Sequence, residues 1–342
     1  MIEIVDLTPD CESKWNKFIE THPDALLYYG LDYRDFLANI VGGKTRYRLA
    51  LENGVAVGVL PIIERDGPYG RVLNSLPFFG SYGSPLARDS DVFRVLMLDW
   101  GEITDGRDIA AATMIMNPLA GLVPSDIPFD VDDHRTGQFT TLPSSVNAEA
   151  AILDAIDSTA QRNIRRARQA GVIVEEDANA LPFLESIHRA NMAEISGLAK
   201  PPSYFSTIPA SFRYGKDWRL YVASKDGVPV AAVLLFYFQG VVEYFTPAIT
   251  SDGRKCQATA LILLVAMVAA SERGYRMWNW GGTWPDQDGV FRFKRKWGAN
   301  ARPYRYFVRI RNQDLLKATR SDLLASYPWF YILPFRLLAE VD

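Results

Sequence analysis

The stretch that decides the fold is Trp278-Asn279-Trp280-Gly281-Gly282-Thr283, followed closely by Phe291-Arg292-Phe293-Lys294-Arg295-Lys296-Trp297-Gly298-Ala299. The first part predicts a buried strand over residues 275–281, with both tryptophans on one face because side chains alternate along a strand. The paired glycines let the backbone turn sharply or let a ligand approach closely. The second part predicts a short helix rich in cations, and such a helix beside a glycine turn indicates a site for an anionic group.

This short helix is expected to begin at Asp288, which suits the N-cap position, and to end before Gly298. Val290, Phe293 and Trp297 recur at helical spacing and predict its apolar face. Under this interpretation the lysines and arginines of the helix lie on its remaining, polar surface.

Composition predicts a compact protein with about two domains. The chain has 342 residues, of which 48% are hydrophobic and 23% charged, and its formal net charge is −3. This charge does not mark a nucleic-acid binder, so any such binding must come from local patches. Cys11 and Cys256 are the only cysteines and lie far apart. Their spacing favours a reducing compartment and indicates neither a disulfide nor a metal site.

Two segments bear on whether the chain is directed to a membrane. Residues 1–12 carry acidic side chains and no long apolar run, so they do not resemble a secretory signal. The strongly apolar run 258–270 is too short to cross a bilayer and predicts a fully buried helix.

Two segments of similar build indicate an internal repeat. LENGVAVGVL at 51–60 and SKDGVPVAAVLL at 224–235 each place Asn-Gly or Asp-Gly between runs of strand-forming residues. This pattern is the strongest short-range signal for a β-hairpin. Each hairpin precedes a further aromatic strand region, and the two lie almost half a chain apart. The parallel order favours two similar domains over two unrelated hairpins. Helices interleaved with these hairpins predict the mixed α/β (α+β) class.

A second basic helix is predicted over residues 158–170. Ser158 and Gln161 fit an S-x-x-Q capping box at its start. Guanidinium groups bind phosphate through paired hydrogen bonds, so arginines that share a helix face can bind phosphates. A solvated charged face gives the same pattern. The arginines that share one face, at i, i+3 and i+4, are Arg162, Arg165 and Arg166.

Three segments of the chain resemble the FemABX family and its relatives among the GNAT-fold acyltransferases. They are GGT…D.GV.RFKRKWGA at 281–299, STAQRNIRRARQAGVIV at 158–174 and RVLNSLPFFGSYGSPLA at 71–87. The resemblance covers roughly residues 28–306 and keeps the three segments in order.

The resemblance implies two tandem GNAT-like domains, each a mostly antiparallel sheet flanked by helices. The first domain is expected over residues 1–147 and the second, with the main motifs, over 148–311. A helical tail over 312–342 is expected to pack on the first domain. This tail is unusually aromatic, which would also suit peripheral contact with a membrane surface.

No catalytic triad can be assembled from the sequence. His22, His134 and His188 lie in unrelated segments without partner motifs. The chemistry must therefore rest on positioning and electrostatics. This fits acylation of an amine by an activated ester, because the substrate itself supplies the nucleophile.

The resemblance also implies roles for individual residues. Lys294 matches the lysine of a Phe-Lys pair that Fem enzymes use near the acyl-transfer centre, so we expect it to be catalytic. Lys200 and Tyr204 match a basic residue that binds the acceptor's phosphates and a tyrosine four residues after it, which would donate a hydrogen bond or stack on a sugar. Lysine stands where better-known members have arginine. The candidate residues for substrate binding are Lys200, Tyr204, Asn279, Gly281, Gly282 and Phe293. Those for phosphate or RNA binding are Arg162, Arg165, Arg166 and Arg292.

The sequence of the loop before the buried helix indicates which acyl donor the protein uses. GNAT proteins that use CoA carry Q/R-x-x-G-x-G/A there, and the glycines let backbone N–H groups approach the pyrophosphate. This chain has Arg254-Lys255-Cys256-Gln257-Ala258-Thr259, which keeps the basic residue and lacks both glycines. Gln257 and Thr259 would crowd a pyrophosphate. We therefore expect no bound cofactor and aminoacyl-tRNA as co-substrate, with acyl-CoA as the alternative.

The expected protein is a cytoplasmic Fem-like transferase that moves an aminoacyl or acyl group to an amine of a cell-envelope precursor, such as a peptidoglycan muropeptide. Its expected partners are charged tRNA, a phosphate-bearing precursor and, peripherally, the inner face of the membrane. Two alternatives stay open. One is a CoA-dependent N-acyltransferase of exopolysaccharide or lipid assembly. The other is a non-catalytic scaffold that binds envelope precursors.

Overall fold

The computed structural model describes residues 1–78, 81–124, 127–144 and 147–338 of the chain. Positions 79–80 of the predicted segment 71–87, and positions 339–342 of the predicted tail, lie outside the described residues. The chain divides into two compact units, unit 1 with residues 1–135 and 303–342 and unit 2 with residues 136–302.

These limits differ from the predicted domain boundaries at two places. Residues 136–147 belong to unit 2 and residues 303–311 to unit 1. The reason is that two long strands, β9 (Val131–Thr141) and β15 (Asn300–Ile310), each begin in one unit and end in the other. The charged stretch 131–135 carries little strand signal in the sequence.

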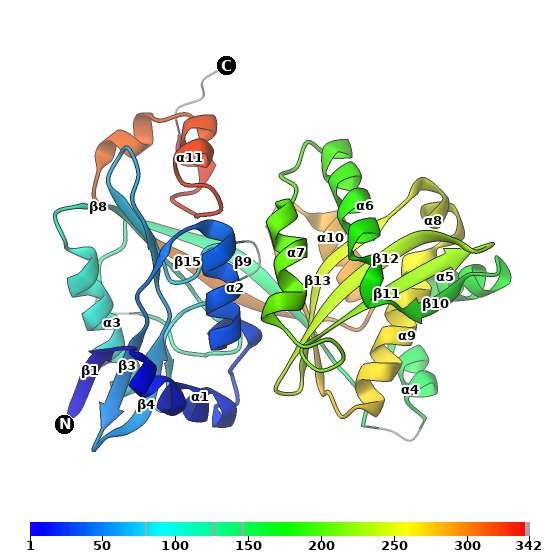
Figure 1. Ribbon diagram of the computed structural model, residues 1–342, viewed down its shortest axis with the longest axis horizontal. Coiled ribbons are helices and arrows are strands. Elements are labelled where there is room, and N and C mark those ends of the chain that lie inside the picture. Colours follow the sequence, from blue (N-terminus) through cyan, green and yellow to red (C-terminus); the bar gives the residue numbers. More distant parts are fainter. Residues whose placement is uncertain (79–80, 125–126, 145–146, 339–342) are drawn as a thin grey trace. The chain divides into compact units, whose positions relative to one another are not determined.

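Unit 2 is built on a sheet that also includes the end of β9 (Figure 1). Its other strands are β10 (Ile173–Glu176), β11 (Trp218–Lys225), β12 (Val228–Phe238), β13 (Val241–Ile249) and β14 (Met277–Thr283). The strand order is β10-β11-β12-β13-β14-β9. Neighbours are antiparallel except β13 and β14, which are parallel.

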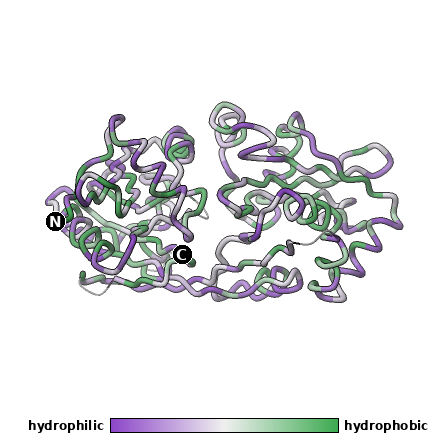
Figure 2. Tube along the Cα trace, turned by 90° about the horizontal axis from the view of Figure 1, so that it is seen from below, coloured by the Kyte–Doolittle hydropathy of each residue, from purple (hydrophilic) through white to green (hydrophobic). Residues whose placement is uncertain are grey.

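Helices cover both faces of this sheet. The helices of unit 2 are α4 (Ala148–Ala155), α5 (Ser158–Gln169), α6 (Leu181–Glu194), α7 (Pro202–Ser211), α8 (Ser251–Cys256), α9 (Ala258–Glu272) and α10 (Asp288–Arg295). Helices α4 and α5 pack against α9, which lies on β11 and β12, whereas α6 packs on β13 and contacts α7. In Figure 2, hydrophobic stretches of the trace lie inside this unit and hydrophilic stretches lie on its outer loops.

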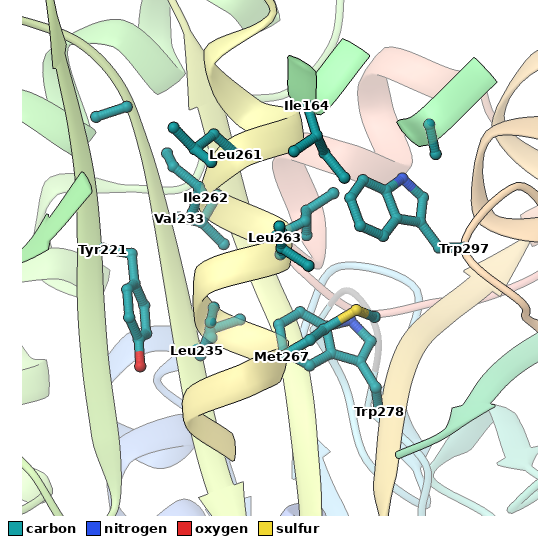
Figure 3. Close-up of a cluster of buried hydrophobic side chains, with 14 of the residues drawn as sticks. Ile164, Tyr221, Val233, Leu235, Leu261, Ile262, Leu263, Met267, Trp278 and Trp297 are labelled. Carbon is teal, nitrogen blue, oxygen red and sulfur yellow. The ribbon is translucent and has the colours of Figure 1, made fainter. Parts of the chain in front are cut away.

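The predicted buried helix is confirmed as α9. Leu261, Ile262, Leu263 and Met267 are all buried, and they meet the strand residue Trp278 in the main core of unit 2 (Figure 3). Each such side chain stabilises the fold by roughly 1.5–3 kcal/mol relative to exposure in water. This core fixes α9 against the sheet and so places the loop that precedes it.

Both predicted hairpins are confirmed. In each turn the two central residues have positive φ, 51° and 77° at Asn53-Gly54 and 52° and 77° at Asp226-Gly227. Positive φ at both positions is the type I′ turn that the right-handed twist of paired strands favours. The turns join β3 (Arg48–Glu52) to β4 (Val55–Leu60) in unit 1 and β11 to β12 in unit 2.

The duplication extends beyond the hairpins. In unit 1, β6 (Arg71–Asn74) and β8 (Ile109–Ile115) pair in parallel and enclose α3 (Ser90–Thr104) in the chain. In unit 2, β13 and β14 pair in parallel and enclose α9. Parallel neighbours need such a crossover connection.

Unit 1 contains two sheets. The first has the order β1-β3-β4-β7, and the part of the second that lies in this unit has the order β15-β8-β6-β5-β2. The remaining elements are β1 (Ile2–Asp6), α1 (Glu12–Thr21), α2 (Leu31–Val41), β2 (Lys44–Thr45), β5 (Ile63–Arg65), β7 (Leu86–Ala87) and α11 (Arg320–Ser326).

The aromatic tail after β15 belongs to unit 1. Tyr327 Oη donates a hydrogen bond to the carbonyl oxygen of Gly70 at 2.8 Å and accepts one from the Tyr69 N–H at 3.0 Å. Its ring lies so close to Gly67 that a Cβ there would come within 2.2 Å of it. The tail contains short helical turns, not one long amphipathic helix. Within the described residues, no helix has the length and apolar character that crossing a membrane requires.

The start of α5 differs from the predicted capping box. The N-cap is Asp157, whose carboxylate accepts a hydrogen bond from the Thr159 N–H at 2.6 Å, and Ser158 is already helical. Gln161 donates its side-chain amide to the Leu153 carbonyl oxygen instead of closing a box. A carboxylate one residue earlier is at least as good an acceptor for the first helical N–H groups.

Candidate active site

The centre of unit 2 is the place where β13 and β14 part. Their described pairing ends at Glu243 and Asn279, and both side chains are buried there. Asn279 Nδ2 donates to Glu243 Oε2 at 2.7 Å, and its Oδ1 accepts from the Gly281 N–H at 2.9 Å. Asn279 therefore fixes the end of the paired region and the turn of the chain that follows it.

Gly281 forms a bulge in β14, where the register with β9 shifts between Asn279 and Gly282. Its φ of +73° lies in the left-handed region that favours glycine. A Cβ at this position would meet no atom within 4 Å, so open space borders the backbone. The predicted glycine turn is thus a strand bulge with an accessible main chain.

Lys294, on α10, points into the protein and is buried. Its Nζ donates to the carbonyl oxygens of Gly281 at 3.2 Å and Gly282 at 3.0 Å, and to Thr283 Oγ1 at 2.8 Å. Burial lowers the pKa of Lys294 to about 8. The ammonium is therefore held by neutral oxygens beside the bulge and is easier to deprotonate than a surface lysine.

The predicted apolar face of α10 holds for Trp297 and is wrong for Val290 and Phe293. Trp297 is buried together with Lys294, whereas Val290 and Phe293 are exposed. Helical spacing favoured the apolar side chains, but the bulge offers carbonyl oxygens that need a donor. Lys294 supplies it and lies on the inner side with Trp297, three residues later, whereas Val290 and Phe293 stay exposed.

Lys200 likewise donates hydrogen bonds to oxygen atoms of a strand, in this case β13. Its Nζ donates to the Phe245 carbonyl oxygen at 2.9 Å and to Thr246 Oγ1 at 2.6 Å. It also lies 4.5 Å from the ring centroid of Phe245 and 4.8 Å from that of Tyr204, within cation–π distance. Burial lowers the pKa of Lys200 to about 7.

Tyr204 lies in helix α7 and is fully buried. Its hydroxyl lies 2.9 Å from Thr246 Oγ1. Nearby, His188 Nε2 accepts a hydrogen bond from the backbone N–H of Lys200 at 3.1 Å. Burial, and then the charge of Lys200, lower the pKa of His188 to about 4, so this histidine is neutral at neutral pH. The contacts of Lys200 and Tyr204 are thus with their own unit, and their predicted role in binding acceptor phosphate stays a prediction.

A pocket of about 360 Å³ lies at the start of α9. One wall includes Ile249 and Arg254. The other includes Arg292 of α10 and Lys296, the residue that follows this helix. Arg254 pairs with Glu194 at 2.6 Å, whereas Arg292 and Lys296 form no ion pair with a described residue. The pocket is therefore positively charged and suits an anionic group. Its remaining lining residues are Ala160, Asn163, Gln257, Thr259, Ala260, Gly289, Phe293 and Trp297.

Gln257 occupies the position of the first missing glycine. Its φ of +60° keeps a left-handed backbone that glycine adopts at no steric cost. Its side-chain amide folds back and donates to the Arg254 carbonyl oxygen at 2.8 Å. Both Gln257 and Thr259 line the pocket. The loop thus retains a glycine-type conformation while its side chains fill space beside the backbone.

The predicted arginine face on α5 is exposed. Arg162, Arg165 and Arg166 form no ion pair with a described residue, while Arg168 on the same helix pairs with Glu149 at 2.7 Å. The amide N–H of Asp157 donates to the Lys296 carbonyl oxygen at 2.8 Å, which places the start of α5 beside the end of α10.

The sequence-predicted residues therefore fall into four sets within unit 2. Lys294, Asn279 and both glycines meet at the bulge, and Lys200 and Tyr204 meet at Thr246 of β13. Arg292 and Phe293 line the pocket. The predicted arginines exposed on α5 are Arg162, Arg165 and Arg166. Sequence reasoning missed Thr283, Glu243 and Lys296. Only Lys296 carried a signal, as a member of the basic run. The other two became visible through their buried contacts.

Comparisons with known proteins agree with this architecture. Residues 157–295 match the family model of an acetyltransferase (GNAT) domain, a range that includes α5, the pocket loop and α10. A comparison with curated proteins found no match.

Solved structures with this fold span almost the whole chain. FemX is 14% identical with a TM-score of 0.68, and the match covers 92% of this chain and 98% of FemX. The C-terminal domain of a putative lysylphosphatidylglycerol synthetase from Agrobacterium fabrum is 14% identical with a TM-score of 0.54, covering 95% and 99% of the two chains. A tandem GNAT protein from the clavulanic acid biosynthesis pathway is 15% identical with a TM-score of 0.52, covering 91% and 98%. At these identities the likeness shows the fold.

Residues 157–295 therefore carry a GNAT-type acyltransferase domain, and the fold of the chain agrees with it. The predicted fold class, with tandem GNAT-like domains, is confirmed. The predicted resemblance to the FemABX-like group of GNAT-fold proteins is confirmed as well.

Proposed function

We propose that this acyltransferase moves an aminoacyl group from charged tRNA to an amine of a phosphate-bearing cell-envelope precursor, in the cytoplasm. The observation that carries the proposal is the buried Lys294 ammonium beside the open bulge at Gly281 and Gly282. A positively charged pocket without the two CoA glycines lies in the same unit.

The reaction needs little from the protein beyond positioning and charge. The acceptor amine attacks the ester carbon of the aminoacyl group, a C–N bond forms, and the C–O bond to the donor ribose breaks. The amine loses one proton, and the leaving hydroxyl gains one. Lys294 would exchange one of its three hydrogen bonds for one to the oxyanion that develops on the carbonyl oxygen of the ester, a contribution worth about 2.7–4 kcal/mol in comparable sites.

The anionic parts of the substrates would bind the basic surfaces. Arg292 lines the pocket, and the arginine face of α5 is free of carboxylate partners among the described residues. RNA or a diphosphate would bind there through charge-assisted hydrogen bonds. FemX and the lysylphosphatidylglycerol synthetase domain share the fold, which agrees with an envelope substrate.

The experiment supplies two donors separately. The purified chain is incubated with tRNA charged with a radiolabelled amino acid, or with labelled acyl-CoA, and each reaction receives a panel of amine acceptors. Consumption of charged tRNA only when an acceptor is present supports the proposal, with Lys294→Met as the matched inactive control. Acceptor-dependent consumption of acyl-CoA alone would contradict it.

One observation favours a second candidate, a CoA-dependent N-acyltransferase. The backbone at Gln257 has a left-handed conformation that glycine adopts freely, and Arg254 stands at the basic position of the CoA pattern. The acyl-CoA arm of the same experiment distinguishes the two donors.

A further inference from the structure

Exposed apolar side chains gather on two segments of unit 2. The loop after α6 exposes Ile195 by 70% and Leu198 by 50%. The connection into α10 and the helix itself expose Trp284 by 44%, Val290 by 41% and Phe293 by 37%. Clustered exposure of large apolar side chains usually marks an interaction surface.

Helix α10 exposes apolar and basic side chains together. Val290 and Phe293 are exposed, although Phe293 also packs edge-on against the buried Trp280. Arg292 and Arg295 are exposed on the same helix. The outer surface of α10 is therefore apolar and cationic at once.

Both segments adjoin residues that line the pocket. Glu194, the last residue of α6, pairs with Arg254 on one wall, and Asn191 exchanges hydrogen bonds with the backbone of Ile249 on the same wall. The exposed loop follows Glu194 directly. Gly289 and Phe293 of α10 form part of the other wall. Exposed apolar side chains thus lie near residues that line the pocket, and cations line the pocket itself. These apolar side chains are called the pocket rim.

We propose that this pocket rim docks on an anionic lipid bilayer. Aromatic side chains favour the membrane interface, aliphatic side chains enter the acyl boundary, and cations bind the lipid phosphates. RNA would use the cations and the aromatic rings. It would leave the aliphatic Ile195, Leu198 and Val290 without a partner, since these have no ring to stack on a base. The docking surface goes beyond the proposed transfer reaction and does not depend on it.

The experiment is co-sedimentation of the full-length protein with vesicles of phosphatidylcholine alone or of phosphatidylcholine with phosphatidylglycerol. We expect binding to the anionic vesicles and little binding to the neutral ones. The double variants Trp284→Ser/Val290→Ser and Ile195→Ser/Leu198→Ser should each weaken binding at least 10-fold. The matched control is Ile173→Ser/Val228→Ser, which removes equally exposed apolar residues elsewhere in unit 2 and should bind like the unchanged protein.

Two results would overturn the proposal. One is equal binding by the rim variants and the control. The other is loss of RNA binding, measured by filter retention, in the rim variants while vesicle binding persists, which would assign the rim to RNA. Thermal unfolding of each variant separates a docking defect from a folding defect, because these side chains are exposed and their loss should leave the melting temperature near that of the control. Transfer activity is not a readout here, so the proposed function can fail without affecting this result.

Discussion

Lys200 and Lys294 bind the backbone of two neighbouring strands just beyond the point where those strands stop pairing. Lys200 donates to the Phe245 carbonyl oxygen on β13, and Lys294 donates to the Gly281 and Gly282 carbonyl oxygens on β14. Each ammonium also binds a threonine hydroxyl. In a regular sheet, pairing of the two strands would supply hydrogen-bond donors to these carbonyl oxygens. Here Lys200 supplies a donor to β13 and Lys294 supplies donors to β14.

Lys294→Met should lower the turnover number about 10²-fold or more, because removal of one oxyanion donor typically costs that much. Steady-state kinetics with the donor identified above measures it. Lys296→Met is the matched control, since it removes a neighbouring cation that does not reach the bulge. Equal losses in both variants, or full activity in Lys294→Met, would contradict the assignment.

The pH dependence of kcat/KM should show a falling limb near pH 8. Burial lowers the pKa of Lys294 to about 8, so the donor ammonium loses its proton as the pH rises through that value. An ordinary lysine would keep its proton to about pH 10. Lys294→Arg should move the falling limb out of the measurable range, because arginine stays protonated. A falling limb at the same pH in that variant would assign it to another group.

Lys200 should make stability depend on pH between about 7 and 10. The unfolded chain protonates this lysine below its ordinary pKa of 10.5, whereas the folded protein does so only below about 7. Between these values the unfolded state binds more protons, so the free energy of unfolding rises with pH. Urea denaturation at several pH values measures the slope, and Lys200→Met should reduce it. An unchanged slope would mean that Lys200 is charged in the folded protein.

Acetyl-CoA should not bind at low micromolar concentration in calorimetry, because Gln257 and Thr259 occupy space that the CoA pyrophosphate needs. The double variant Gln257→Gly/Thr259→Gly should bind it more tightly. Gln257→Gly keeps the backbone, since φ of +60° favours glycine. Tight binding by the unchanged protein at this loop would refute the donor assignment.

Replacing Arg162, Arg165 and Arg166 with alanine should weaken RNA binding and flatten its dependence on salt, because fewer counterions are released. Binding isotherms between 50 and 200 mM salt, roughly the range in which phosphate contacts change affinity most visibly, measure the slope. Arg168→Ala is the control on the same helix, because its guanidinium already pairs with Glu149. A slope that stays the same in the triple variant would leave these arginines as a solvated face.

Local signals in the sequence were enough for much of the fold. The Asn53-Gly54 and Asp226-Gly227 turns lie where predicted, because type I′ turns depend on the two central residues alone. The buried helix was recognisable because its apolar side chains leave no polar face. The strand 131–141 was not, since its first half, after Val131, is an unbroken run of polar residues. These residues find partners within unit 1, as Asp133 does with Arg135 and Tyr331.

The candidate site was predictable in its members but not in its orientation. Resemblance pointed to Lys294, yet helical spacing placed the apolar side chains of α10 inward. The inward turn of Lys294 depends on carbonyl oxygens that a bulge more than ten residues earlier leaves open. Likewise, the burial of Tyr204 depends on Thr246 and Phe245, which are distant in sequence. Contacts of this kind are set by tertiary packing and leave no periodic trace.

Because β15 begins in unit 2 and ends in unit 1, unit 1 cannot finish folding until the end of the chain has been synthesised. Unit 2 is a single stretch, so the ribosome has released all of it before residues 303–338 appear. During that interval β8, all of whose residues are buried in the finished protein, lacks the antiparallel partner that pairs Tyr306 with Ile115. An open apolar edge of this kind invites pairing with other chains. Nascent unit 1 is therefore the part of the protein that most needs a chaperone, and a chain stopped after residue 302 should aggregate although every residue of unit 2 is present.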